Sequence, residues 1–271
     1  MTALNLLALC AFALSCYGWG NIARLCFHAD RQPYSYVVAL GLVVLAFIGG
    51  VLNAIHLASY RSIAICAYIG ILVGMCFLVP AFRNVGWRSP YTPNLRAQWI
   101  FAVAAVSTAI FLTVTLLPTT IFNVGDDFRT YLPRIVRMRE TGTLGGNPFE
   151  MLGLSDFGTQ SFFQALLMTW FPLTYAYSFD TIFCFVLGLW LLIDFGGSNK
   201  CTAGMMTFAI CVYVIINPQI VNISSVYSTT ALVLTLIIAT KSFLEALHKG
   251  ARDAPALILV FGIVGRHRNT S

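Results

Sequence analysis

Charged residues are scarce in this sequence of 271 residues: Asp, Glu, Lys and Arg make up only 10% of it, whereas 58% is hydrophobic. A soluble domain carries about 25% charged residues, and the mean hydropathy here is +0.81. Such a composition cannot cover a water-exposed surface, so it excludes a soluble enzyme, a secreted disulfide-rich domain and a disordered regulator. The class that remains is a polytopic membrane protein.

The sequence also lacks the spacings that build metal and disulfide sites. None of its eight cysteines forms a C-x-x-C pair, and its four histidines are scattered without ligand spacing. We therefore expect neither a disulfide framework nor a structural zinc site. The net charge is +6, but the basic residues are spread thinly between apolar runs. This pattern is typical of anchors at lipid headgroups, so we expect the lipid bilayer as a partner and no nucleic acid.

What the sequence does contain is a series of long apolar runs, and a bilayer core needs about 20 apolar residues as a helix. These runs fall at 3–20, 36–57, 63–82, 99–121, 174–195, 202–218 and 225–246, with a shorter stub at 254–264. They predict an all-α fold, a single polytopic transmembrane helix bundle over 1–271 with about seven to eight spans. N-terminal spans occupy 1–121, a long loop occupies 122–160, and C-terminal spans occupy 161–271.

Two segments differ from the other apolar runs, and the basic residues predict an orientation for the whole bundle. The first run lacks a charged n-region, so we interpret it as a retained span and not as a signal peptide. Residues 161–172 predict a half-length helix that lies at the interface or extends into the next span. With the N-terminus outside, nine Lys and Arg fall on the inner side and three on the outer side, leaving out the loop 122–160. Because basic residues favour the cytoplasmic side, we predict an external N-terminus and an external loop.

The loop 122–160 concentrates the polar chemistry of the chain. Apolar residues at helical spacing predict an amphipathic surface helix over 127–141, kinked near Pro133 and stopped at Gly142. A carboxylate beside it can accept a proton from a hydroxyl or hold a divalent cation, and arginines can pair with phosphate. The plainer alternative is that an aspartate caps the helix and that the arginines anchor it in the headgroups. The loop holds half of the ten acids, namely Asp126, Asp127, Glu140, Glu150 and Asp156, together with Arg129, Arg134, Arg137 and Arg139.

The pattern D-D-x-x-x-Y-x-x-R, from Asp126 to Arg134, resembles the first external loop of the GT-C superfamily. These are polytopic glycosyltransferases that use polyprenyl-phosphate sugars, and they include the protein O-mannosyltransferase and lipid A aminoarabinose transferase relatives. The continuation from Gly142 to Phe149 is similar to uncharacterised bacterial membrane proteins of that type. The resemblance covers residues 121–170 and the general hydropathy of the chain.

The resemblance implies a cell-envelope enzyme in a bacterial inner (plasma) membrane. It would transfer a sugar from a lipid-linked donor to a lipid, glycan or protein acceptor on the outer face. No cofactor follows from it, although a divalent cation is compatible with the aspartate pair. The implied site comprises Asp126 or Asp127 as the catalytic acid or base, Arg129, Arg134 and Arg137 as substrate-binding residues toward the phosphate, and Tyr131 at the acceptor pocket.

Two features depart from the family pattern and leave alternatives open. The acid usually follows the first span in this family, whereas three further spans precede it here. The chain is also short for the family, as a truncated and inactive fragment would be. Asp180 lies within an apolar run, where an acid is by default a functional-site hypothesis. The alternative is that Asp180 reaches the interface near the start of its span, whereas Asp194 falls at the opposite, interfacial end. A transporter or permease would depend on Asp180. The oligomeric state is left open.

Overall fold

The computed structural model describes residues 2–26, 33–83, 127, 131–145, 158–199, 201–215 and 226–248. Within these ranges the chain contains eight α-helices and no strand, which confirms the all-α prediction. The run 99–121 and the stub 254–264 lie outside the described residues. The helices are α1 (Thr2–Cys26), α2 (Tyr34–Ala54), α3 (Tyr60–Arg83), α5 (Leu132–Thr141), α6 (Thr159–Leu167), α7 (Phe185–Ser198), α8 (Ala203–Ile215) and α9 (Val226–His248).

Three of the described helical segments are long and apolar enough to cross a bilayer, namely Tyr34–Ala54, Tyr60–Val79 and Phe179–Gly197. They coincide with three of the predicted runs, because a helix is the structure in which an apolar segment satisfies its own backbone in lipid. Large apolar side chains lie exposed along α3, which suits a lipid-facing helix better than a water-facing one. These exposed side chains include Ile65, Tyr68, Ile69, Leu72, Met75 and Val79.

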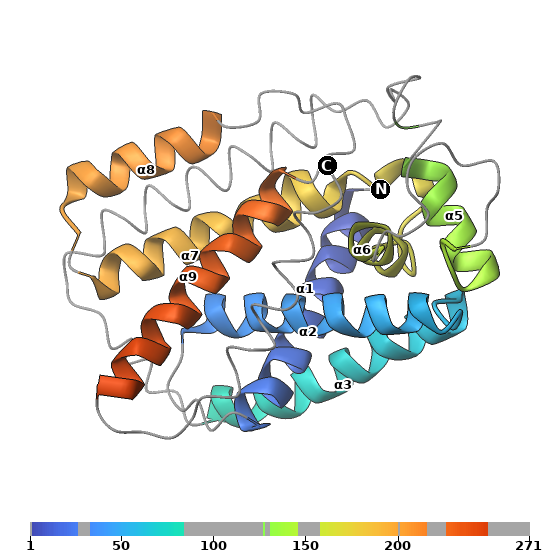
Figure 1. Ribbon diagram of the computed structural model, residues 1–271, viewed down its shortest axis with the longest axis horizontal. Coiled ribbons are helices and arrows are strands. Elements are labelled where there is room, and N and C mark those ends of the chain that lie inside the picture. The colour runs from blue at the N-terminus through green and yellow to red at the C-terminus, as the bar shows by residue number, and fades with distance from the viewer. Residues whose placement is uncertain are drawn as a thin grey trace.

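The helices α2, α7 and α8 extend along the long axis of the molecule, and α5 and α6 lie together at one end (Figure 1). We call this the α5 end. Asn53, in the last turn of α2, contacts residues that follow α5, so α2 ends there. Ser35, at the start of α2, donates a hydrogen bond to Oδ2 of Asp194 near the end of α7. The helices α2 and α7 therefore run in opposite directions.

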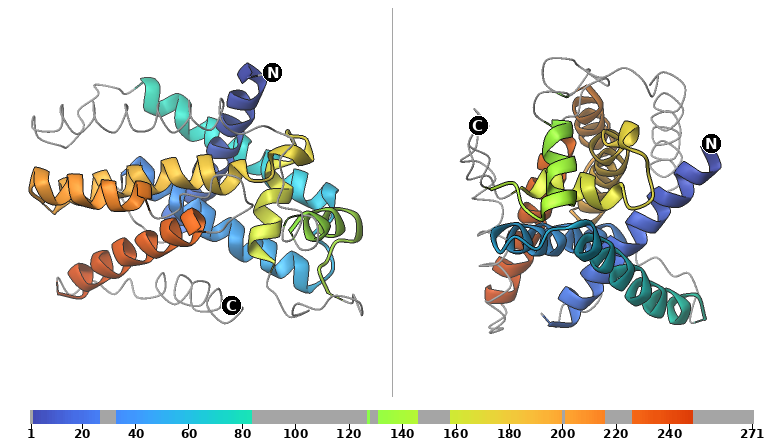
Figure 2. Two further views of the ribbon diagram at one scale, coloured as in Figure 1. Left: turned by 90° about the horizontal axis from the view of Figure 1, so that it is seen from above. Right: turned by 90° about the vertical axis from the view of Figure 1, so that its right-hand side faces the viewer.

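Close backbone contacts bring α1 onto α2 and α3, which it crosses (Figure 2). A Cβ at Gly41 of α2 would overlap the carbonyl oxygen of Cys16, and a Cβ at Gly20 of α1 would overlap that of Val37. Only glycine allows two helix backbones to approach so closely, as is common between membrane helices. Trp19 Nε1 also donates to the carbonyl oxygen of Cys66 at 2.9 Å and joins α1 to α3.

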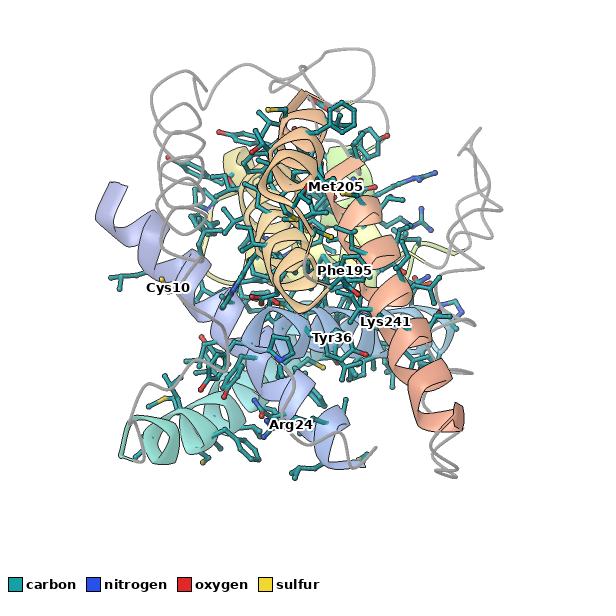
Figure 3. All side chains as sticks on the ribbon, turned by 90° about the vertical axis from the view of Figure 1, so that its left-hand side faces the viewer. Cys10, Arg24, Tyr36, Phe195, Met205 and Lys241 are labelled. Carbon is teal, nitrogen blue, oxygen red and sulfur yellow. The ribbon has the colours of Figure 1, made fainter. Side chains whose placement is uncertain are left out.

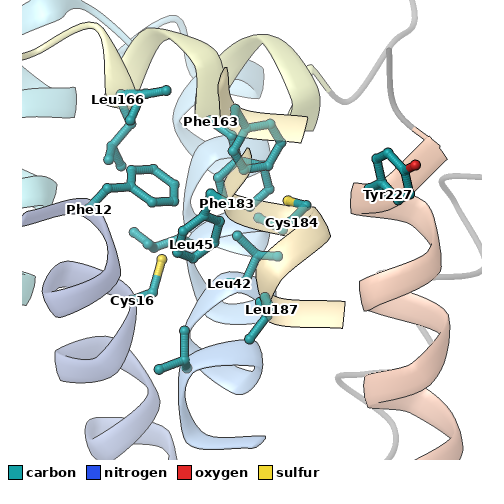
Figure 4. Close-up of a cluster of buried hydrophobic side chains, with 14 of the residues drawn as sticks. Phe12, Cys16, Leu42, Leu45, Phe163, Leu166, Phe183, Cys184, Leu187 and Tyr227 are labelled. Carbon is teal, nitrogen blue, oxygen red and sulfur yellow. The ribbon is translucent and has the colours of Figure 1, made fainter. Parts of the chain in front are cut away.

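An aromatic cluster forms the centre of the core, where α1, α6 and the start of α7 meet (Figure 4). Phe12 contacts Phe183 edge to face with ring centroids 4.6 Å apart, and Phe163 stacks on Phe179 at 4.9 Å. Such pairs contribute about 0.5–1.5 kcal/mol each beyond the area they bury. The cluster therefore fixes α6 against the start of the third candidate span.

The half-length helix predicted at 161–172 is shorter than expected and separate from the next span. α6 ends at Leu167, and Pro172 follows the turn after it. A 3₁₀ turn at Leu173–Tyr175 and a π-helix at Phe179–Cys184 then lead into α7. Because Pro172 has no backbone N–H to continue a helix, α6 does not extend into the span.

Candidate functional site

The helix α5 is the described part of the surface helix predicted for 127–141. It begins at Leu132 with Pro133 in its first turn, a position where proline removes no helical hydrogen bond. The segment 128–130, across which a kink near Pro133 would show, lies outside the described residues, so the kink stays a prediction. Gly142 follows the last helical residue in the left-handed conformation with φ 81°, as its stop signal predicted. The buried face of α5 carries Leu132, Ile135 and Met138.

Asp127 lies shortly before α5 and is fully buried, with 0% of its surface exposed. Burial of a carboxylate is costly unless the surroundings stabilise it. It also holds the group in one place, which an acid or base needs in order to exchange a proton with a bound substrate. The neighbouring candidate Asp126 lies outside the described residues.

The predicted substrate-binding residues are only partly described, since Arg129 lies outside the described ranges. Tyr131 is half-buried and packs against the hydrophobic core at the start of α5. Arg134 is half-buried on α5. Arg137 donates from Nη2 to the carbonyl oxygen of Gly145 at 2.8 Å, so part of its guanidinium fixes the chain after the helix. The structure thus places three of the four predicted residues along one short segment.

Arg139 has a different environment from the other arginines of α5. Its guanidinium lies over the ring of Tyr60 at the start of α3, with Cζ 5.0 Å from the ring centroid. A cation over an aromatic face contributes about 0.5–1 kcal/mol at an exposed site. Arg139 therefore helps to attach α5 to α3, a role that its sequence position did not reveal.

Asn53 holds the segment after α5 against the end of α2. Its Oδ1 accepts from the backbone N–H of Leu144 at 2.7 Å, and its carbonyl oxygen accepts from Thr143 Oγ1 at 3.1 Å. The backbone N–H of Ala58 donates to the carbonyl oxygen of Gly142 at 2.8 Å. These three bonds, which we call the Asn53 clamp, fix α5 to the α2–α3 connection. No pattern in the sequence pointed to Asn53.

Asp180 lies in the π-helix before α7 and is fully buried. Its Oδ1 accepts from the backbone N–H of Ser228 at 2.7 Å, and its Oδ2 accepts from that of Tyr227 at 3.4 Å. Both donors belong to the first turn of α9, whose N–H groups have no partner within the helix. Asp180 therefore caps α9 from a neighbouring helix. This geometry gives the acid a structural role that neither alternative in the sequence had included.

The π-helix carries a further polar contact on its other side. Tyr213 of α8 places its hydroxyl 3.1 Å from the carbonyl oxygen of Cys184 and 3.3 Å from that of Phe185, and donates to them. The rings of Phe185, Tyr213 and Tyr227 pack together, with centroids 4.9–5.5 Å apart. The wider turn of a π-helix leaves carbonyl groups available for such contacts. This segment thus joins α7, α8 and α9.

A second polar cluster lies at the opposite end of α7. Lys241 of α9 donates to Oδ1 of Asn199, and its Nζ lies 5.7 Å from the ring centroid of Phe195 (Figure 3). Asp194 is buried and bonded to Ser35. Asp180 and Asp194 therefore join neighbouring helices at the two ends of the third candidate span.

The described residues contain no group of three or more His, Cys, Asp and Glu side chains arranged to hold a metal ion. What the α5 end provides is a buried carboxylate, Asp127, a helix with three arginines, and a clamp that fixes the end of that helix to the α2–α3 connection. This set can hold an anion and move a proton. No known family, curated protein or solved structure matches the chain.

Proposed function

We propose that this chain is a membrane glycosyltransferase of GT-C type, which transfers a sugar from a polyprenyl-phosphate donor to a lipid, glycan or protein acceptor. The observation that carries the proposal is the position of Asp127, fully buried just before an arginine-bearing helix that is fixed to the core. In this reaction a carboxylate removes the proton of the acceptor hydroxyl. The acceptor oxygen then bonds to the sugar carbon while the bond from that carbon to the phosphate oxygen breaks.

The residues of the α5 end divide these tasks between them. Asp126 or Asp127 takes the proton, and Tyr131 lines the acceptor side. The phosphate of the leaving lipid carries negative charge, which guanidinium groups bind well, in pairs where the geometry allows. Arg129, Arg134 and Arg137 fill this role.

The proposal requires the α5 end to face the side of the membrane where lipid-linked sugars are used. We propose about seven to eight spans with the N-terminus outside and the α5 end at the outer face of a bacterial inner membrane. The ends of α7 and α9 support this arrangement: Asp180 meets Ser228 near the start of both helices, and Asn199 meets Lys241 near their ends. These helices run in the same direction, as two spans separated by one further crossing would.

The orientation can be tested with Glu140→Cys in a cysteine-free background. Glu140 is exposed on α5, so a membrane-impermeant maleimide should label it in intact cells. Arg24→Cys, near the far end of α1, is the matched control and should be labelled only after the cells are opened. The reverse result would place α5 on the inner side and contradict the topology.

The catalytic role can be tested with Asp126→Asn and Asp127→Asn in nanodiscs, using radiolabelled polyprenyl-phosphate sugars and a membrane extract as the acceptor source. Asparagine keeps the shape of the side chain but cannot take the proton, so we expect transfer to fall at least about 100-fold in one of the two variants. Glu140→Gln, an exposed acid on the same helix, is the matched control and should keep its activity. Unchanged transfer in both aspartate variants, with normal melting curves, would overturn the proposed role.

A further inference from the structure

Within the part of the chain that the structure describes, neither end of the amide of Gln164 on α6 has a hydrogen-bond partner. The residue is fully buried, with 0% of its surface exposed, and neither Oε1 nor Nε2 is bonded within the described residues. Buried side-chain amides are almost always paired, because leaving both groups unpaired costs free energy. A buried amide of this kind is therefore a candidate for binding a polar ligand.

The position of Gln164 on α6 separates it from the apolar contacts of that helix. Phe162 lies against Gly49 of α2, where a Cβ would overlap its ring. Gln164 and the preceding polar residues Gln160 and Ser161 share another face, because residues three and four apart lie one above the other on a helix. α6 thus presents an aromatic side toward α2 and a polar side away from it.

The polar side of α6 belongs to the same end of the molecule as the proposed site. α5 packs directly against α6 (Figure 1). A Cβ at Gly158, just before α6, would lie 2.8 Å from Cε of Met138 on α5. The arginines of α5, which are the candidate phosphate-binding residues, and Gln164 of α6 therefore lie on two helices that contact each other.

The chemistry of an amide selects the kind of partner. Nε2 donates and needs an acceptor, whereas Oε1 accepts and needs a donor. An ionised phosphate only accepts, so it would leave Oε1 unpaired. Hydroxyl groups both donate and accept, so a ligand with adjacent hydroxyls satisfies both ends.

We propose that Gln164 binds hydroxyl groups of the donor sugar, while the arginines of α5 bind the phosphate. This assignment rests on the proposed function and deepens it, because it separates recognition of the sugar from recognition of the lipid phosphate. Gln164 then helps to determine which sugar the enzyme accepts.

The experiment compares two ligands by the rise in Tm of the protein in nanodiscs. One is bare polyprenyl phosphate, and the other is a panel of polyprenyl phosphates carrying hexoses or aminopentoses. In the wild type, at least one sugar-bearing lipid should raise Tm more than the bare phosphate. In Gln164→Met, which has nearly the same shape, this additional rise should vanish, with about tenfold weaker binding of the sugar lipid and unchanged binding of bare phosphate.

Two further variants keep the test decisive. Gln164→Leu is a second apolar replacement, for use if the methionine variant folds poorly. Leu167→Met, at a fully buried position of the same helix, is the matched control and should keep the full response to the sugar.

The remaining outcomes identify which proposal fails. An equal response to the sugar lipid in wild type and Gln164→Met overturns the sugar contact and leaves the proposed function standing. A wild type that binds bare phosphate but gains nothing from any sugar also overturns the sugar contact. If neither ligand raises Tm in the wild type, the proposed function fails as well.

Discussion

Asn53 Oδ1 and the backbone N–H of Leu144 are 2.7 Å apart, although the two residues are separated by 91 positions in the sequence. This bond joins the last turn of α2 to the chain that leaves α5. It is the shortest of the three bonds in the Asn53 clamp. The orientation of the arginine-bearing helix therefore depends on a neutral side chain of another helix.

Asn53→Ala should release this segment. The change leaves the N–H of Leu144 without its partner in a buried place, so we expect a loss of about 1–3 kcal/mol in the free energy of unfolding. Denaturant titration in detergent measures the loss, and trypsin cleavage at Arg137 should become faster. Asn21→Ala is the matched control, because the Nδ2 of Asn21 donates within its own helix, to the carbonyl oxygen of Tyr17. Equal protease resistance in wild type and Asn53→Ala would contradict the clamp.

Gly142→Ala should destabilise the end of α5 for two reasons. The residue has φ 81°, which costs an L side chain energy, and the new Cβ would lie 2.6 Å from the carbonyl oxygen of His56. We expect a loss of more than about 1 kcal/mol. The matched control is Gly204→Ala on α8, where nothing lies within 4 Å of the added Cβ. Alanine should stabilise that helix by up to about 1 kcal/mol. The two substitutions should therefore shift the midpoint of unfolding in opposite directions.

Asp180→Asn tests whether the buried acid serves as a cap or as a transport residue. An amide can replace one accepting oxygen but not both, so the first turn of α9 should open more often. Hydrogen exchange at Tyr227 and Ser228 should become faster, with about 1–2 kcal/mol lost in stability. Asp194→Asn, which alters the other end of α7, should leave exchange at these two amides unchanged. Loss of a transport activity with normal exchange would instead favour the transporter hypothesis.

Gly41→Ala probes the contact between α1 and α2. The added methyl group would overlap the carbonyl oxygen of Cys16, so the two helices must separate. Overfilling a close contact of this kind costs about 1–3 kcal/mol. Unfolding by a denaturing detergent should occur at a lower concentration than in wild type. A curve that coincides with the wild type would show that α1 moves aside freely.

Several elements were predictable because their signals are local. An apolar run of span length marked α2, α3 and the helix that includes α7, since lipid leaves a backbone little alternative to a helix. The glycine at position 142 marked the end of α5 through its own backbone freedom.

The contacts that hold the candidate site together were not predictable, because they join distant parts of the chain. Asp180 meets Ser228 across 48 positions, and Ser35 meets Asp194 across 159. The hydropathy of each run indicates that a helix exists but not which helix lies beside it. Gln164 was missed for a related reason: a single polar residue in a short apolar helix gives no sign of whether its amide will find a partner.

The two bonds between α7 and α9 have a mechanical consequence. Asp180 bonds to Ser228 near the start of these helices, and Lys241 bonds to Asn199 toward their far ends. The two helices are therefore fixed to each other at both ends. If one helix moved along the other, both of these hydrogen bonds would break at once. A gap that admits a long lipid chain must then open between another pair of helices, with α7 and α9 moving as a rigid unit.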